Sequence, residues 1–216
     1  MPHEGPITGA ILAGGRASRL GGADKSSLLV GGRRILERQV EALHAVTRDV
    51  LIVAGTAHDV RFDRTGLRVV HDRVEGAGAL GGIYTALTSA APGRVIVLAC
   101  DLPFVTGAWL ARLIAEPADA ADAVVPRGPR GLEPLCAVYA TAAAPAIAAR
   151  IARGALRAAP LEPDLRVREI APEVVAEFDR DGLLFANVNT PHDYERARAA
   201  EELRSEASGN RITEPS

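Results

Sequence analysis

The sequence has almost no lysine and no excess of positive charge. One residue, Lys25, is the sole lysine among 25 Lys and Arg residues. The formal net charge of −2 leaves no basic field of the kind that nucleic-acid-binding proteins need. No apolar run reaches the roughly 18 residues of a membrane-spanning helix. The N-terminal stretch MPHEGPITGAIL also lacks the basic and apolar regions of a secretory signal. We therefore expect a cytoplasmic protein with neither nucleic acid nor membrane as a partner.

The sequence is also poor in groups for metal or covalent chemistry. Its two cysteines, Cys100 and Cys136, lie in apolar, strand-like runs, so we expect buried, reduced thiols. The five histidines lack zinc-binding spacing, and no serine elbow or Cys–His pair indicates covalent catalysis. A length of 216 residues supports one large core. We expect one domain over residues 1–204, and a disordered tail over 205–216, which has no apolar periodicity.

Residues 8–30, TGAILAGGRASRLGGADKSSLLV, run from an apolar strand into a loop rich in glycine and cations. Gly14 and Gly15 allow backbone N–H groups to turn toward a ligand and allow the ligand to come close. Arg19 and Lys25 supply charge for polyphosphate oxygens. Lys25 offers a compact charge for a single phosphoryl oxygen. The alternative explanation is that one lysine is retained by chance in an arginine-rich chain. The segment predicts a phosphate-binding loop.

The first half of the chain alternates between strand and helix patterns. The predicted strands cover residues 8–12, 50–54, 67–70 and 94–99. Helices are predicted at residues 35–46, at the end of the glycine-rich segment 76–87, and at 108–115, where Thr106 is the N-cap. This alternation predicts an α/β fold with a doubly wound, mostly parallel sheet in three layers. The loop, Asp72 and Asp101 each follow a predicted strand, so we expect them at one edge of the sheet, where such folds bind ligands.

The second half has weaker patterns. Strands are predicted at residues 123–125, 135–139, 167–170 and 184–188, and an alanine-rich helix at 142–159. Residues 127–133 contain Arg127, Arg130 and several glycine or proline breakers, which predicts an exposed loop that is mobile without ligand. Thr190 and Pro191 mark the start of a last helix that is predicted to run to about Leu203.

The phosphate loop has a specific form. It fits neither the Walker A pattern nor the dinucleotide fingerprint GxGxxG. It reads LAGGxxxRLGGxDKxxL over residues 12–28, and this resembles the signature loop of the molybdenum cofactor guanylyltransferase (MobA-type) family of nucleotidyltransferases. The resemblance implies a Rossmann-like nucleotidyltransferase fold. It also implies that the loop binds nucleotide through Leu12, Ala13, Gly14, Gly15 and Lys25.

Asp101 is the expected metal ligand. A carboxylate at a strand end can hold Mg²⁺, which needs one or two protein carboxylates in addition to phosphate oxygens. On the residues alone, a structural role in the turn before Pro103 is equally well supported. The segment ACDLP, residues 99–103, resembles the family's CD-x-P segment, and this favours the metal.

The resemblance implies roles for five further residues. Asp72 resembles a family position that contacts the nucleotide, although a solvated turn residue is the alternative. Gly82 belongs to a segment like the family's GPLAG and would allow close approach to the ligand; a tightly packed helix start is the alternative. Asn187 and Asn189 match the family's NxNTP segment and would bind substrate or complete the metal shell. Arg157 is a candidate for the acceptor's phosphate, or else a solvated arginine on a helix.

The implied reaction transfers GMP from GTP to the terminal phosphate of molybdopterin and releases pyrophosphate. In it, Lys25, Arg19 and Asp101 with Mg²⁺ would be catalytic, and transient contact with molybdoenzymes or their chaperones is implied as well. Two alternatives stay open. One is a related transferase that uses CTP or a sugar-phosphate acceptor, which the doubled glycine Gly14-Gly15 disfavours. The other is a non-catalytic nucleotide-binding accessory protein, since a fold does not fix a function.

Overall fold

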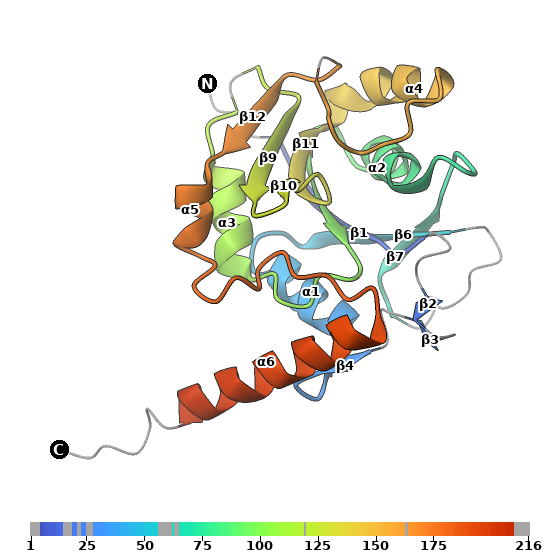
Figure 1. Ribbon diagram of the computed structural model, residues 1–216. Helices are drawn as coiled ribbons and strands as arrows, with labels where there is room; N and C mark the ends of the chain where they lie inside the picture. The colour runs from blue at the N-terminus through green and yellow to red at the C-terminus, as the bar shows by residue number, and fades with distance from the viewer. Residues whose placement is uncertain are drawn as a thin grey trace.

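The computed structural model describes residues 5–14, 19–20, 23–24, 28–55, 62, 65–118, 120–162 and 164–209. Four parallel strands form one side of its main sheet, in the order β7-β6-β1-β8 with β7 at the edge. These strands are β1 (Ile7–Leu12), β6 (Asp49–Ala54), β7 (Arg68–His71) and β8 (Arg94–Ala99). All four agree with the predicted strands to within one or two residues, and their carboxyl ends lie at one edge of the sheet (Figure 1).

The sheet continues beyond β8 with strands from the second half of the chain. These are β9 (Ala123–Gly128), β10 (Gly131–Leu132), β11 (Cys136–Ala140) and β12 (Val167–Ile170). Strand β11 is antiparallel to both β8 and β9, whereas β12 runs parallel to β9. The predicted mostly parallel α/β fold is therefore confirmed. Two small sheets join β2 (Arg19–Leu20) to β3 (Ala23–Asp24) and β4 (Leu29–Val30) to β5 (Arg33–Arg34).

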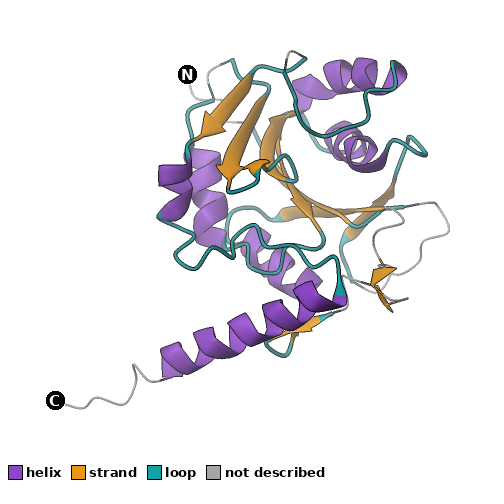
Figure 2. Cartoon of the chain, viewed as in Figure 1, coloured by secondary structure: helices purple, strands orange, loops and turns teal. Residues whose placement is uncertain are grey.

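Helices cover both faces of the main sheet (Figure 2). One face packs against α1 (Ile35–His44), α3 (Gly107–Ala115) and α5 (Pro172–Ala176), and the other against α2 (Gly78–Ser89) and α4 (Ala144–Ala152). Alternation along β1 explains this arrangement, because successive side chains of a strand point to opposite faces. Ile11 belongs to the core cluster on the α1–α3 side, and its neighbour Ala10 to the cluster on the α2–α4 side. The structure therefore has the three predicted layers, with the sheet between two layers of helices.

Helix α6 (Pro191–Gly209) crosses one end of the molecule and extends away from the body (Figure 1). Its first half packs on a third apolar cluster, which includes Val30, Phe104 and Val188. The helix continues to Gly209, so the prediction of disorder from residue 205 is wrong for 205–209. Residues 210–216 lie outside the described chain. Among the helices that the structure describes, none is long and apolar enough to cross a membrane.

Two predicted elements of the second half differ from the structure. The helix predicted over residues 142–159 is a short 3₁₀ turn followed by α4, which ends at Ala152. It ends there because Gly154 has a φ of +76°, the left-handed conformation that commonly terminates helices. The strand predicted at 184–188 is absent from that segment, where Ala186 N donates to Leu183 O (2.9 Å) within a turn. The short helix α5 was not predicted.

Candidate active site

The end of β1 provides the first wall of the site. Leu12 and Ala13 are buried, and Ala13 N donates to Val53 O (2.8 Å), which continues the parallel ladder past the strand. Gly14 is exposed and comes next. A Cβ at position 14 would lie 3.2 Å from backbone atoms of Gly55, so glycine lets the chain turn close to the end of β6. The predicted nucleotide-binding residues Leu12, Ala13 and Gly14 therefore begin the loop at the carboxyl edge of the sheet.

Asp72 lies immediately after β7 at the same edge. Its backbone N–H donates to Ala54 O (3.0 Å), and its Oδ1 accepts hydrogen bonds from Thr85 Oγ1 (3.0 Å) and Val74 N (3.2 Å). Thr85 is fully buried in α2, and its hydroxyl also accepts a hydrogen bond from Arg73 N (3.0 Å). The carboxylate is thus held in one orientation by α2. Thr85 was missed at the level of sequence; the one available signal is a polar residue on an otherwise apolar helix face.

The start of α2 packs tightly against these two strand ends. A Cβ at Gly81 would lie 3.2 Å from both carboxylate oxygens of Asp72, and a Cβ at Gly82 would lie 3.2 Å from Leu12 Cδ1. The approaching atoms belong to the protein itself, which is the tight packing of a helix start that was the alternative for Gly82. Contact between Gly82 and a nucleotide stays a prediction.

Asp101 follows β8 and is joined to the C-terminal asparagine segment. Val188 N donates to the backbone oxygen of Asp101 (2.9 Å). Asn187 and Asn189 flank Val188, so the fold brings both predicted substrate residues beside the predicted metal ligand, although they are far apart in sequence. Cys100 N also donates to Leu12 O (3.1 Å), which ties this turn to the end of β1.

The start of α6 fixes the asparagine segment from the other side. Asp193 Oδ2 accepts hydrogen bonds from Asn189 N (3.1 Å) and Thr190 N (2.9 Å), while Asp193 N donates to Thr190 Oγ1 (3.1 Å). This reciprocal cap confirms the predicted helix start. The hydrogen bond from Thr190 is the main cause that lowers the pKa of Asp193. The carboxylate therefore stays ionised and the cap stays formed at neutral pH.

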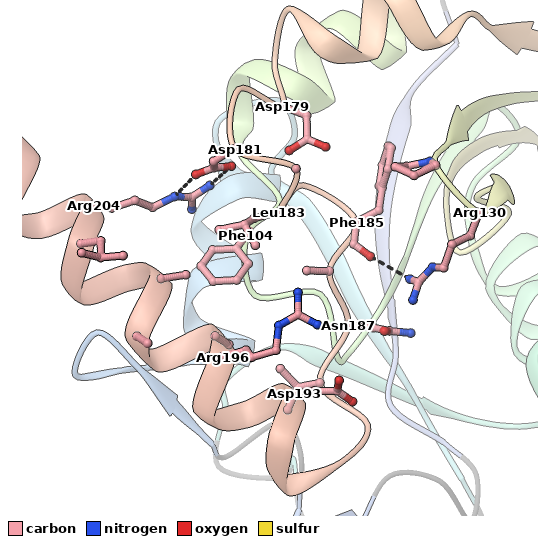
Figure 3. A pocket seen from close by; sticks show the side chains of 18 of the residues that line it. Phe104, Arg130, Asp179, Asp181, Leu183, Phe185, Asn187, Asp193, Arg196 and Arg204 are labelled. Atoms are coloured by element: carbon pink, nitrogen blue, oxygen red, sulfur yellow. Dashed lines mark hydrogen bonds and ion pairs between the residues drawn. The ribbon is translucent and has the colours of Figure 1, made fainter.

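A groove of about 740 Å³ lies beside this segment, between the β9–β10 hairpin, residues 179–188 and α6 (Figure 3). Arg130 reaches it from the hairpin and Arg196 from α6, with Asn187 between them. Because Asn187 lines the groove and its neighbour Val188 bonds to Asp101, the groove begins beside the expected metal ligand. Its acidic side chains are those of Glu133, Asp179, Asp181 and Asp193.

The hairpin replaces the loop that was predicted over residues 127–133. Arg127 Nη2 donates to Glu169 Oε2 on β12 (2.6 Å), and Arg130 Nη2 donates to Phe185 O (3.2 Å). Within the segment, Gly131 pairs with Gly128 and Leu132 with Arg127, which forms a short hairpin in place of the expected irregular loop. Glu133 ends the hairpin half-buried in the groove. Burial raises the pKa of Glu133, and the charge of Arg130 lowers it by less.

The remaining predicted site residues are Gly15, Arg19, Lys25 and Arg157. Gly15 and Lys25 lie outside the described chain, and for Arg19 only the backbone is described, where it pairs with Asp24 between β2 and β3. Arg157 is exposed beyond α4, and its carbonyl accepts a hydrogen bond from Arg150 Nη2 (2.9 Å). The roles assigned to these four residues stay predictions. Cys100 and Cys136 are buried and neither forms a disulfide, as expected.

The site fits a metal ion that is shared with phosphate oxygens. Within the described ranges, no group of three or more His, Cys, Asp or Glu side chains could hold a metal by itself. Mg²⁺ does not need such a group, because one or two carboxylates suffice when a polyphosphate supplies further oxygens. Asp101, at a strand end beside an asparagine segment, offers this kind of donor set.

A family model described as MobA-like NTP transferase domain matches residues 9–162. A molybdenum cofactor guanylyltransferase from Desulfosudis oleivorans is 35% identical over 196 residues, which cover 90% of this chain and 95% of the relative. The chain belongs to the MobA-like NTP transferase family. A probable molybdenum cofactor guanylyltransferase from Pelotomaculum thermopropionicum is 37% identical over 195 residues, covering 90% of this chain and 93% of the relative.

Solved structures of similar proteins agree with this assignment. The Archaeoglobus fulgidus molybdopterin-guanine dinucleotide biosynthesis protein A has a TM-score of 0.77 and 29% identity, over 92% of this chain and 99% of that one. A Mycobacterium tuberculosis protein in complex with manganese shares the fold, with a TM-score of 0.62 and 20% identity over 91% of this chain and all of that one. This MobA-like chain is therefore a nucleotidyltransferase with a role in molybdenum cofactor biosynthesis, and its family typically uses a divalent metal.

Proposed function

We propose that the chain transfers GMP from GTP to the terminal phosphate of molybdopterin, forming the guanine dinucleotide cofactor and pyrophosphate. The observation that carries this proposal is the hydrogen bond from Val188 N to Asp101 O (2.9 Å). It joins the asparagine segment to the sheet edge at which Leu12 ends β1, with Gly14 just beyond it, and at which Asp72 follows β7. This contact supports an acceptor site beside Asp101, at the same sheet edge that we propose for the nucleotide, as an in-line transfer requires.

The proposed reaction needs charge neutralisation more than proton transfer. A phosphate oxygen of the acceptor attacks the α-phosphorus of GTP, the bond to the α–β bridging oxygen breaks, and pyrophosphate leaves with that electron pair. The attacking phosphate is already ionised at neutral pH, so no general base is required. We assign Lys25 to the α-phosphate and Arg19 and the loop N–H groups to the β- and γ-phosphates. Mg²⁺ held by Asp101 would add positive charge where negative charge develops.

The acceptor is assigned to the groove. Asn187 and Asn189 bind it next to Asp101, and Arg157 remains a candidate for its phosphate. Relatives named as guanylyltransferases support GTP as donor and molybdopterin as acceptor. We also propose a cytoplasmic enzyme in which one domain over residues 1–204 performs the reaction, with transient contact to molybdoenzymes or their chaperones.

Nucleotide binding with Mg²⁺ tests the donor side of the proposal. GTP, CTP, ATP and UTP are titrated against the wild-type protein and the Lys25→Ala variant by calorimetry. We expect GTP to bind most tightly and the variant to lose that affinity. Preference for CTP would keep the mechanism and change the donor. Absence of nucleotide binding would contradict both the phosphate-binding loop and the proposed transfer.

A further inference from the structure

We propose that Glu133 binds the polar edge of the acceptor's pterin ring, with Arg130 beside it. This inference rests on the proposed function, and it adds a residue that determines which acceptor is used. That edge carries a 2-amino group, an N3–H and a 4-carbonyl. The first two are parallel N–H donors that suit one carboxylate, and the carbonyl suits a guanidinium.

Glu133 lies on the acceptor side of Asp101. Strand β11 pairs with β8 with Cys136 opposite Leu98, and Ala99 N donates to Leu135 O (2.8 Å). The chain just before β11 therefore runs beside the end of β8, where Asp101 follows. Strands β1, β6 and β7 lie on the opposite side of β8, and they carry the residues assigned to the nucleotide.

The position of Glu133 is fixed by its surroundings. Its N–H donates to Pro126 O (2.9 Å), and its carbonyl accepts a hydrogen bond from Cys136 N (3.0 Å). The side chain lies over Gly128, where a Cβ would come 2.7 Å from Glu133 Oε1. Glycine at 128 thus makes room for the carboxylate. A recognition group held in this way loses little conformational entropy when a ligand binds.

The carboxylate has no hydrogen-bond donor of its own within the described chain. The side chain of Glu133 accepts none from these residues, and Arg130 Nη2 donates to Phe185 O instead. Half-burying an ionised carboxylate without a protein donor costs free energy, and perturbed carboxyl groups in a cleft cluster at functional sites. Glu133 lines the groove. A ligand there can therefore supply the missing donors.

Guanine presents the same edge as a pterin, so the shared chemistry is a 2-amino-4-oxopyrimidine ring. The position of Glu133 across β8 from the nucleotide residues favours the pterin. Three proteins are compared by fluorescence titration with neopterin monophosphate and, separately, with GTP and Mg²⁺: the wild type, Glu133→Gln and Glu169→Gln. The last is a matched control, because it removes one carboxylate charge from the exposed pair with Arg127.

We expect Glu133→Gln to weaken neopterin monophosphate binding about 10- to 100-fold, the usual range for a charged hydrogen-bond pair. The affinity of Glu133→Gln for GTP should equal that of the wild type. The Glu169→Gln protein should bind both ligands as tightly as the wild type does. Unchanged pterin affinity in Glu133→Gln would overturn the proposal, and so would a loss confined to GTP, which would assign the residue to guanine. A wild-type protein that binds GTP and no neopterin monophosphate would also overturn it.

A second titration remains informative if the variant folds poorly. The 2-oxo analogue of neopterin monophosphate presents an acceptor where the amino group was. The wild-type protein should bind it about 10-fold or more weakly than the amino compound, and Glu133→Gln should lose most of this discrimination. Equal discrimination by both proteins would contradict the inference. Glu133-dependent pterin binding without GMP transfer would instead refute the proposed function and leave the inference standing.

Discussion

Asp72 and Asp101 both follow a strand at the same edge, yet they are joined to different parts of the molecule. The Asp72 carboxylate is committed to Thr85 and Val74. Asp101 is joined through its backbone to Val188 and is the carboxylate expected to hold the metal. Position after a strand could be predicted for both residues. The partner of each could not, because Thr85 and Val188 approach through tertiary contacts.

We predict that Asp101→Asn lowers pyrophosphate release about 100- to 1000-fold, because one electrostatic contact to the reacting phosphate is lost. The substitution keeps the shape and the backbone bond to Val188. A thermal melt should therefore place its Tm near that of the wild type. A rate within threefold of wild type at saturating Mg²⁺ would remove Asp101 from the reaction.

Thr85→Val should destabilise the protein by about 1–3 kcal/mol, since Asp72 Oδ1 and Arg73 N both lose a buried partner. Thr88→Val is the control in the same helix. The Thr88 hydroxyl donates to carbonyls of its own helix, Tyr84 O among them (2.9 Å), which already belong to the helix ladder. We expect less than about 1 kcal/mol there. Urea unfolding measures both variants, and equal effects would argue against a special role for Thr85.

The burial of Glu133 should make the stability of the protein depend on pH. Its pKa in the folded state is raised by burial above the ordinary 4.5, so the free energy of unfolding falls as the pH rises through that pKa. Glu133→Gln should therefore raise the Tm at pH 7.5 by about 1–3 °C. Its advantage over the wild type should shrink as the pH falls toward 4.5.

Asp122 provides a control of opposite sign for the Glu133 measurement. The hydrogen bond from Arg166 lowers the pKa of Asp122, so its contribution to stability is present at neutral pH and is lost on acidification. Asp122→Asn should thus lower the Tm at pH 7.5, and the difference should shrink at low pH. A Glu133→Gln protein less stable than the wild type at pH 7.5 would indicate that Glu133 has a structural partner.

Among the elements, α6 depends most on a single side chain. Arg38, on α1, donates to Pro103 O (2.9 Å), Val30 O (3.1 Å) and Glu201 Oε1 (2.7 Å). Its ion pair with Glu201 is mostly shielded, with side-chain exposures of 17% and 16%. Arg38 therefore joins α1, the turn after β8 and the groove-lining helix α6.

Arg38→Leu should destabilise the protein by about 2–4 kcal/mol, because two carbonyls and a shielded carboxylate lose their donor. The exposed pair of Arg33 with Glu41 gives the control, with exposures of 51% and 65%. Arg33→Leu should cost less than about 1 kcal/mol. Chemical denaturation distinguishes the two, and similar small losses would mean that α6 is held by its apolar face alone.

The elements differ in how far the sequence could predict them. The strand β8 was predicted with its observed ends, since RVIVLA is short, β-branched and apolar. The β9–β10 hairpin was not, because its Gly and Pro residues equally suit a loop. Its Arg127 and Arg130 side chains contact Glu169 and the carbonyl of Phe185, which lie 42 and 55 residues further along the chain. Local patterns contain no information about such contacts.

At the scale of the whole molecule, one sheet connects two halves, and the sequence predicts one half better than the other. The half proposed to bind the nucleotide consists of parallel strands whose carboxyl ends share one edge, and its loop has a specific motif. The fold of this half and its candidate site residues could therefore be predicted together. The acceptor half is assembled from the hairpin, residues 179–188 and α6, which meet through tertiary contacts alone. Asn187 and Asn189 were found by motif. Glu133 lies in a segment, residues 133–135, that resembles the family's segment near the acceptor site only loosely, and the groove itself needed the structure.

One measurement tests the central claim most directly. The protein is incubated with Mg²⁺, molybdopterin and either GTP or CTP, and both the dinucleotide product and pyrophosphate are quantified. We predict equimolar guanine dinucleotide and pyrophosphate from GTP, little product from CTP, and at least a 100-fold slower reaction with Asp101→Asn. A faster reaction with CTP, or pyrophosphate release that does not require molybdopterin, would contradict the account.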